Sequence, residues 1–133
     1  MIKTFTIESK GKIEFIDITR IIEEAIDENI EEGLCHIYTP HTTAGLTINE
    51  NYDPNVHKDI INTLNKLIPE NSQYLHMEGN AHSHIKTSLI GNSLTIPINN
   101  GKLMLGRWQG IFLCEFDGPR KRNIYLMIIP IKK

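Results

Sequence analysis

Apolar and polar residues alternate in several short segments of this chain, which is typical of β-strands with one buried face. Residues 2–7 alternate in this way, and residues 12–16 follow Gly11. The pattern therefore predicts an N-terminal hairpin of two strands. Compact apolar segments at 34–38 and 46–48 indicate two further strands, of which the first is buried.

Three other segments repeat apolar residues at the spacing of an amphipathic helix. An aspartate or asparagine precedes each of them and can cap the helix start, while glycine or proline follows at the other end. The helices are expected from Asp17 to Gly33, from Asp53 to Pro69, and from Asn80 to the neighbourhood of Gly91.

The C-terminal third reads as strands separated by short turns that contain glycine. Such turns favour antiparallel pairing. The whole pattern predicts an α+β domain, with a mainly antiparallel or mixed β-sheet and two to three helices packed on one side. The C-terminal strands are expected at 94–98, 102–108, 111–116 and 123–131.

The composition bounds the class of protein. A length of 133 residues fits one domain spanning 1–133, and a 40% hydrophobic content is enough for a core. The formal net charge of -2 favours neither nucleic acid nor an anionic membrane as partner. We expect a cytoplasmic protein, because neither a signal peptide nor an apolar run of membrane-spanning length is visible. Cys35 and Cys114 lie in apolar surroundings and are expected to be buried, reduced thiols.

The segment from His76 to Lys86 holds the densest candidate chemistry. It places three imidazoles, a carboxylate, an amide and an ammonium in a short stretch. Imidazole and carboxylate suit a divalent metal or a proton-transfer site. The helix start at 79–81 can bind a phosphate through its backbone N–H groups while His84 supplies chemistry. The alternative is a polar loop followed by a solvated helix face.

Two upstream features add candidates. His41-Thr42-Thr43 ends a buried strand, where an imidazole and two hydroxyls suit a site, although ordinary turn chemistry accounts for them equally well. Glu50 precedes the second helix without an evident structural role, which makes it a candidate metal ligand or general base.

A downstream cluster contains Glu115 and Asp117, which share a strand face by the period of two. Two carboxylates on one face repel each other unless a cation lies between them. Arg120 can be that cation, or it can bind a phosphate through two hydrogen bonds. An exposed hairpin turn is the alternative. Gln109 lies in mid-strand beside apolar residues and is expected to face the site.

The motifs along the chain are HTTAGLTINEN at 41–51, DP at 53–54, HMEGNA at 76–81, HIK at 84–86, GKLMLGRWQ at 101–109 and EFDGPR at 115–120. Their identity and order closely resemble the YjbQ family, the secondary thiamine-phosphate synthases. The resemblance extends from about Tyr38 to Arg122. It departs at His82, a position that varies in the family and is often acidic, so His82 is not counted as a site residue.

The resemblance implies an α+β domain that forms a homotrimer, with sites near the subunit boundaries. It also implies a weak thiamine phosphate synthase activity. That reaction joins the pyrophosphate ester of an aminopyrimidine to a thiazole phosphate and releases pyrophosphate. The expected partner is therefore a phosphorylated small molecule.

Such chemistry favours a divalent cation and positively charged donors on the leaving group. Imidazole ligands suit zinc, whereas pyrophosphate departure suits magnesium, so the metal is left open. The candidate metal ligands are His41, His76 and His84. The candidate catalytic residues are His84, Glu50, Glu115 and Asp117, and the candidate substrate-binding residues are Thr42, Thr43, Asn80, Lys86, Gln109 and Arg120.

Two other functions fit the same residues. One is a trimeric protein that binds a metal or a phosphorylated ligand and has only incidental synthase activity. The other is a metal-dependent hydrolase in which the imidazoles hold a metal-bound water.

Overall fold

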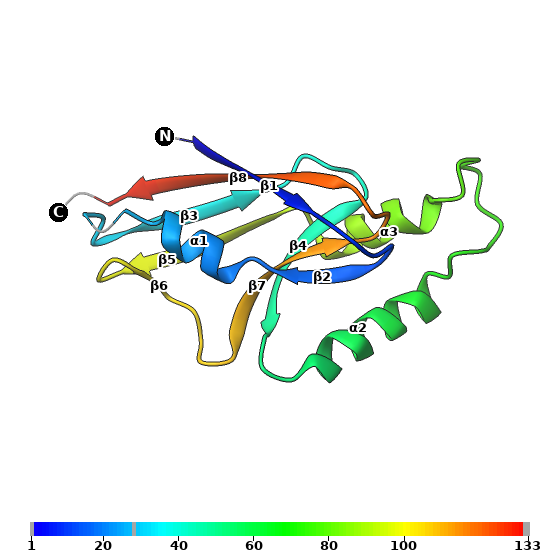
Figure 1. Cartoon of the computed structure of the whole chain (residues 1–133), viewed down its shortest axis with the longest axis horizontal. Coiled ribbons are helices and arrows are strands. Elements are labelled where there is room, and N and C mark those ends of the chain that lie inside the picture. The colour runs from blue at the N-terminus through cyan, green and yellow to red at the C-terminus, as the bar shows by residue number, and fades with distance from the viewer. Residues whose placement is uncertain (1, 28, 132–133) are drawn as a thin grey trace.

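The strands form two antiparallel sheets that lie against each other, with helices at their margins (Figure 1). This computed structural model describes residues 2–27 and 29–131. The strands are β1 (Ile2–Glu8), β2 (Glu14–Asp17), β3 (Glu32–Tyr38), β4 (Ala44–Glu50), β5 (Ser93–Asn99), β6 (Lys102–Leu103), β7 (Gln109–Glu115) and β8 (Lys121–Pro130). The helices are α1 (Thr19–Ala25), α2 (Pro54–Leu67) and α3 (Ala81–Ile90).

The larger sheet has the strand order β1-β8-β3-β5-β6, and the smaller one has the order β2-β7-β4. Neighbouring strands in both sheets run antiparallel. The prediction of an α+β domain with antiparallel pairing is confirmed.

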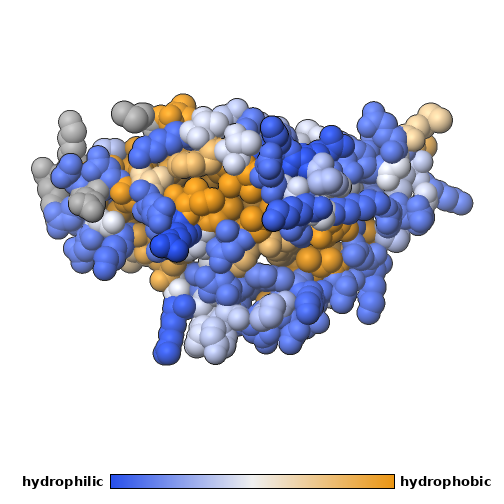
Figure 2. Space-filling view, viewed as in Figure 1, coloured by the Kyte–Doolittle hydropathy of each residue, from blue (hydrophilic) through white to orange (hydrophobic). Residues whose placement is uncertain are grey.

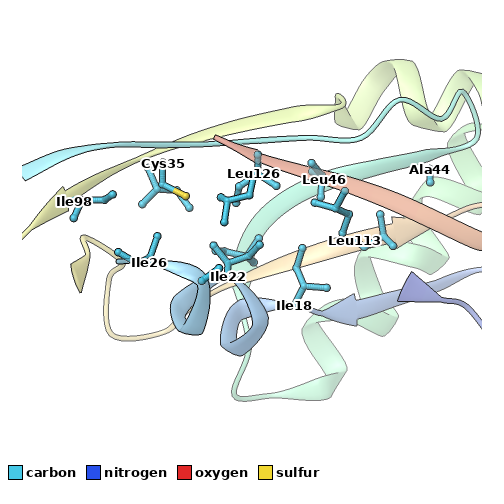
Figure 3. Packing of buried hydrophobic residues seen from close by; sticks show 14 residues of the cluster. Ile18, Ile22, Ile26, Cys35, Ala44, Leu46, Ile98, Leu113 and Leu126 are labelled. Carbon is cyan, nitrogen blue, oxygen red and sulfur yellow. The ribbon is translucent and has the colours of Figure 1, made fainter. Parts of the chain in front are cut away.

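Strand β7 is buried on both of its faces, and this determines where the helices lie. Ile111 and Leu113 point into the main core, between the two sheets and beside α1 (Figure 3). Cys114 and Phe116 point the other way, into a second cluster that includes Leu64 of α2. The helices therefore cover different parts of the core: α1 packs with the main cluster, and α2 packs with the second.

The predicted N-terminal hairpin is wrong, because β1 and β2 belong to different sheets. Strand β1 pairs with β8, and β2 pairs with β7. The short link between them crosses from one sheet to the other, where Ser9 N–H donates to the Arg120 carbonyl at 2.9 Å. Alternation identified both strands, but it carries no information about which distant strand each one pairs with.

The first helix is shorter than predicted. It ends at Ala25, and Ile26 is already extended. Gly33, expected to stop the helix, instead lies within β3, where a Cβ atom would sit 2.5 Å from the Ile129 carbonyl oxygen of β8. That glycine permits close approach of two strands.

The predicted strand at 102–108 is also too long, since β6 holds only Lys102–Leu103. A turn follows in which Gly106 N–H donates to Gln109 Oε1 at 2.7 Å. The second helix agrees with its prediction: Asp53 caps it by accepting a hydrogen bond from Asn55 N–H at 2.9 Å.

The two cysteines lie in the core, as the sequence predicted. Cys35 and Cys114 are buried and unpaired, and burial raises the pKa of the Cys35 thiol to about 11.

Figure 2 shows apolar residues across the middle of one face, framed by hydrophilic ones. Within the described residues, no helix has the length and apolar character needed to cross a membrane.

We expect Gly33→Ala to lower the free energy of unfolding by about 1–3 kcal/mol, because the added methyl group would collide with the β8 backbone. Gly11→Ala is the matched control: its Cβ would meet nothing closer than 3.7 Å, so a change within about 0.5 kcal/mol is expected. Urea unfolding of both variants measures the difference. Equal stability would show that β3 and β8 are not in this register.

Candidate functional site

A cavity of about 400 Å³ lies between the start of β4 and the C-terminal half of α3. Its lining combines two imidazoles with hydroxyl groups and one side-chain amide. Cavities of this size accommodate small molecules. We refer to it as the histidine pocket, lined by His41, Thr42, His84, Thr87, Ser88, Gly91 and Asn92.

Backbone contacts hold the two walls of the histidine pocket together. Leu46 N–H donates to the Gly91 carbonyl at 3.0 Å, and Thr39 N–H donates to the Asn92 carbonyl at 3.0 Å. Position 45 must be glycine for this approach, because a Cβ there would lie 2.6 Å from the Gly91 oxygen. The end of α3 is therefore fixed against β4, and these contacts set the width of the pocket.

His41 has a defined tautomer. The backbone N–H of Asn123 donates to its Nε2 at 2.8 Å, so in the neutral ring Nδ1 carries the proton. Burial lowers the pKa of His41, and the nearby guanidinium groups of Arg122 and Arg120 lower it further, while Glu115 acts in the opposite direction. Burial and the two guanidinium groups thus favour the neutral form of the His41 ring.

His84 lies between two cavities. Besides the histidine pocket, it lines a second cavity of about 440 Å³ together with His76 and the loop before α3. The rings of His76 and His84 are 5.2 Å apart in an edge-to-face arrangement. His76 Nε2 lies 3.8 Å from a carboxylate oxygen of Glu78, which is an ion pair only when the ring is protonated. The sequence cluster therefore does converge on His84.

Asp117 is held by two of the predicted residues. Asn80 Nδ2 donates to its Oδ2 at 2.9 Å, and an Arg120 guanidinium N–H donates to the same oxygen at 3.0 Å. Burial alone would raise the pKa of Asp117, but these hydrogen bonds outweigh it and hold the pKa below its usual value. Arg120 is thus the cation that neutralises Asp117, while the amide of Asn80 is engaged with Asp117.

Glu115 has a structural role. It is fully buried and forms an ion pair with Arg122, with further hydrogen bonds from the Ser9 hydroxyl at 2.6 Å and Asp117 N–H at 3.0 Å. Burial would raise its pKa, but the bonds from Arg122 and Ser9 lower it overall. Arg122 also donates to the Thr43 hydroxyl at 2.8 Å. Glu115 and Thr43 therefore support the wall of the site and do not line the histidine pocket.

Arg122, which supports the wall of the site, is not among the residues that the sequence analysis selected. A signal was available in the alternation of β8, where Arg122 shares the buried face with Ile124 and Leu126. A charged residue in phase with a buried strand face predicts a buried partner of opposite charge.

Lys86 lies away from the histidine pocket and is fully buried. Its Nζ contacts Asn65 Oδ1 of α2 at 2.7 Å and His82 Nδ1 at 2.8 Å. Burial lowers the pKa of the Lys86 amine. The helix turns this predicted phosphate ligand toward α2, whereas His84 faces the pocket.

Glu50 and Gln109 lie at the other end of β4, where they pair across the sheet. Strand β4 spans seven residues, so at roughly 3.3 Å per residue they are about 20 Å from the start of the strand. Glu50 Oε2 accepts from Asp53 N–H at 3.2 Å, and Gln109 closes its own turn. Neither residue joins the histidine pocket within one chain.

The predicted metal ligands are only partly brought together. Within 2–27 and 29–131, no three histidine, cysteine or acidic side chains are grouped so as to hold a metal ion. His76 and His84 are adjacent, but His41 uses Nε2 to accept the Asn123 N–H. One chain therefore offers at most an incomplete ligand set for zinc or magnesium.

Comparison with known proteins identifies a family. The family model described as UPF0047 protein YjbQ-like matches residues 3–131. The UPF0047 protein MJ1081 of Methanocaldococcus jannaschii is 53% identical over 130 residues, covering 97% of this chain and 94% of that protein. The UPF0047 protein YugU of Bacillus subtilis is 47% identical over 131 residues, covering 97% and 99%.

Solved structures share the fold. A YjbQ/UPF0047 family protein from Clostridium acetobutylicum superposes with a TM-score of 0.93 at 48% identity, covering 96% of this chain and 99% of its own. A YbjQ-like protein of unknown function from Sulfolobus solfataricus gives a TM-score of 0.93 at 30% identity, covering 98% and 97%. These names give a fold and a family but no reaction.

Replacing Arg122 by Met should lower the free energy of unfolding by about 3–5 kcal/mol, because it leaves the Glu115 carboxylate buried without its cation. The control is Arg120→Met, which removes a half-exposed ion pair and should cost about 1 kcal/mol or less. Denaturant titration compares the two. Similar losses would contradict the assignment of Glu115 and Arg122 as the central pair.

The His41 ring should titrate below pH 6.5, the ordinary midpoint of histidine. Because the pKa of His41 is lower in the folded state than in the unfolded state, the neutral ring contributes to the free energy of unfolding. That contribution is complete above the unfolded-state pKa and is lost as the pH falls through the folded-state pKa. Histidine ring NMR across pH 4–8 measures the midpoint. A midpoint above 6.5, or a proton on Nε2 of the neutral ring, would contradict the Asn123 hydrogen bond.

Proposed function

Because the chain belongs to the UPF0047 family of YjbQ-like proteins, we propose that it acts on phosphorylated small molecules at the histidine pocket. The reaction that we propose is a weak thiamine phosphate synthesis, with aminopyrimidine pyrophosphate and thiazole phosphate as substrates. The observation that carries the proposal is a cavity of about 400 Å³ in which two imidazoles, several hydroxyls and one side-chain amide face the same space.

The charges around the pocket suit an anionic substrate. Glu115 neutralises the buried Arg122, whereas Arg120 keeps half of its side chain exposed while it is bound to Asp117. The hydroxyls of Thr42 and Ser88 and the amide of Asn92 add neutral hydrogen-bonding groups to the lining. A phosphate group placed here would gain charge and hydrogen bonds at once.

The synthase reaction needs a stabilised leaving group. The thiazole nitrogen attacks the methylene carbon of the aminopyrimidine ester, a C–N bond forms, and the C–O bond breaks with its electron pair leaving on pyrophosphate. We assign His84 as the acid that donates a proton to that oxygen. The neutral His41 offers its Nδ1–H as a hydrogen-bond donor, and Arg120 balances the negative charge that develops.

The proposed reaction can include a zinc or magnesium ion in addition to the protein side chains, but it does not require one. The described residues of one chain do not form a complete ligand set for it, so no step above depends on a metal. A bound divalent cation would supply further positive charge to the phosphates.

A homotrimer is proposed as the assembled form, and the outer face of the larger sheet supports it. Apolar side chains from three neighbouring strands are exposed there side by side, around a cavity of about 430 Å³. Exposed apolar patches of this kind mark interaction surfaces. The residues are Ile2 of β1, Leu34 and Tyr38 of β3, and Met127 and Ile129 of β8.

The test is thiamine phosphate formation by purified protein and by two variants. His84→Gln and Arg120→Gln should each lower the rate about 100-fold or more, the contribution of a positioned acid or charged donor. Arg20→Gln is the control: this exposed arginine also has an acidic partner, Glu24, but lies on α1, and its rate should be unchanged. Light scattering on the same samples gives the mass of the assembly.

Two further measurements distinguish the synthase from a hydrolase and test whether a metal is needed. Release of pyrophosphate without thiazole phosphate would indicate a hydrolase, and loss of activity on chelation would establish a metal requirement. Wild-type rates in both His84→Gln and Arg120→Gln would remove the histidine pocket from the reaction and favour a binding protein with incidental activity.

A further inference from the structure

A separate cavity lies at the opposite end of β4, lined by Glu50, Tyr52, Asp53, Pro54 and Trp108. Its volume is about 630 Å³. The two rings are in contact, with centroids 5.3 Å apart, yet 76% of Tyr52 and 49% of Trp108 remain exposed. Aromatic side chains normally bury most of their surface, so an exposed pair at the rim of a cavity is suited to contact a ligand.

The backbone below these rings is fixed. Asn51 N–H donates to the Trp108 carbonyl at 2.9 Å, which ties the end of β4 to the start of β7. The Asn51 side chain fills the space beside Gly110, where a Cβ would lie 2.7 Å from it. Gln109 closes the preceding turn through Gly106. A ring presented from a rigid frame loses little conformational freedom on binding.

The charges around the cavity favour a cation. Glu50 accepts one hydrogen bond, from Asp53 N–H, and Asp53 accepts one from Asn55 N–H. Among the described residues, no hydrogen bond reaches the second oxygen of either carboxylate. Two carboxylates beside electron-rich ring faces are the chemistry that recognises organic cations.

Arg107 makes a cation–π contact with Trp108 within the chain. Its guanidinium carbon lies 5.0 Å from the centre of the Trp108 ring. The ring therefore accepts a planar cation from the chain itself. An external cation of the same shape would compete with Arg107 for Trp108.

We propose that this aromatic cavity binds a planar organic cation with an amidinium or guanidinium edge. The plane of the ligand packs on Trp108 in place of Arg107, and one N–H donates to the remaining oxygen of Glu50. The site is about 20 Å from the histidine pocket along β4, by the length of that strand, and does not depend on the proposed synthase reaction.

The probe is benzamidinium, with neutral benzamide as the control of nearly equal shape. Trp108 is the only tryptophan in the chain, so its fluorescence reports on this cavity alone. We expect a saturable change with benzamidinium and none with benzamide. Glu50→Gln should weaken binding about tenfold or more, because a charge-assisted hydrogen bond is lost.

The variant Arg107→Gln should have the opposite effect and tighten binding, because it removes the internal competitor. Lys102→Gln on β6 removes an equal charge without a ring contact and should change affinity much less. No saturable signal, equal binding of benzamide, or weaker binding in Arg107→Gln would each overturn the proposal. Circular dichroism of each variant checks that the fold is retained.

Discussion

Glu115 and Arg122 meet where the two sheets approach each other, and both side chains are buried. Burying two charges is costly, and it is stable only when hydrogen bonds use the remaining polar atoms. Here the Ser9 hydroxyl, the Asp117 backbone and Thr43 complete the set. The pair thereby joins β7 to β8 and holds the segments that follow β1 and precede β4.

The histidine pocket depends on this arrangement. Asn123 follows Arg122 directly, and its N–H fixes the ring of His41. The Phe116 carbonyl accepts a hydrogen bond from Ser83 of α3 at 2.6 Å, so the same end of β7 also positions the helix that carries His84. The two imidazoles are thus held from one buried polar centre, which fixes their relative position more firmly than loop contacts would.

Strand β4 separates two kinds of chemistry. At its start, the histidine pocket offers imidazoles, hydroxyls and an amide. At its end, Glu50 and Asp53 lie beside exposed aromatic rings, which suits cations. A single chain keeps the two about 20 Å apart, since an extended strand of this length cannot bring its ends together. Polar clusters that look like one site in the sequence are therefore distributed over two.

The sequence by itself determined the local features, because periodicity, caps and turn residues act over a few positions. It predicted α2 with its Asp53 cap, most of the strands, the burial of both cysteines and the grouping of His76 with His84. Only the tertiary structure decided the pairing of β1 with β8, the role of Gly33, the burial of Lys86 and Glu115, and the distance of Glu50 from the histidine pocket. These depend on contacts between residues far apart in the chain, and alternation or helical spacing shows which face a residue occupies but not which partner it meets.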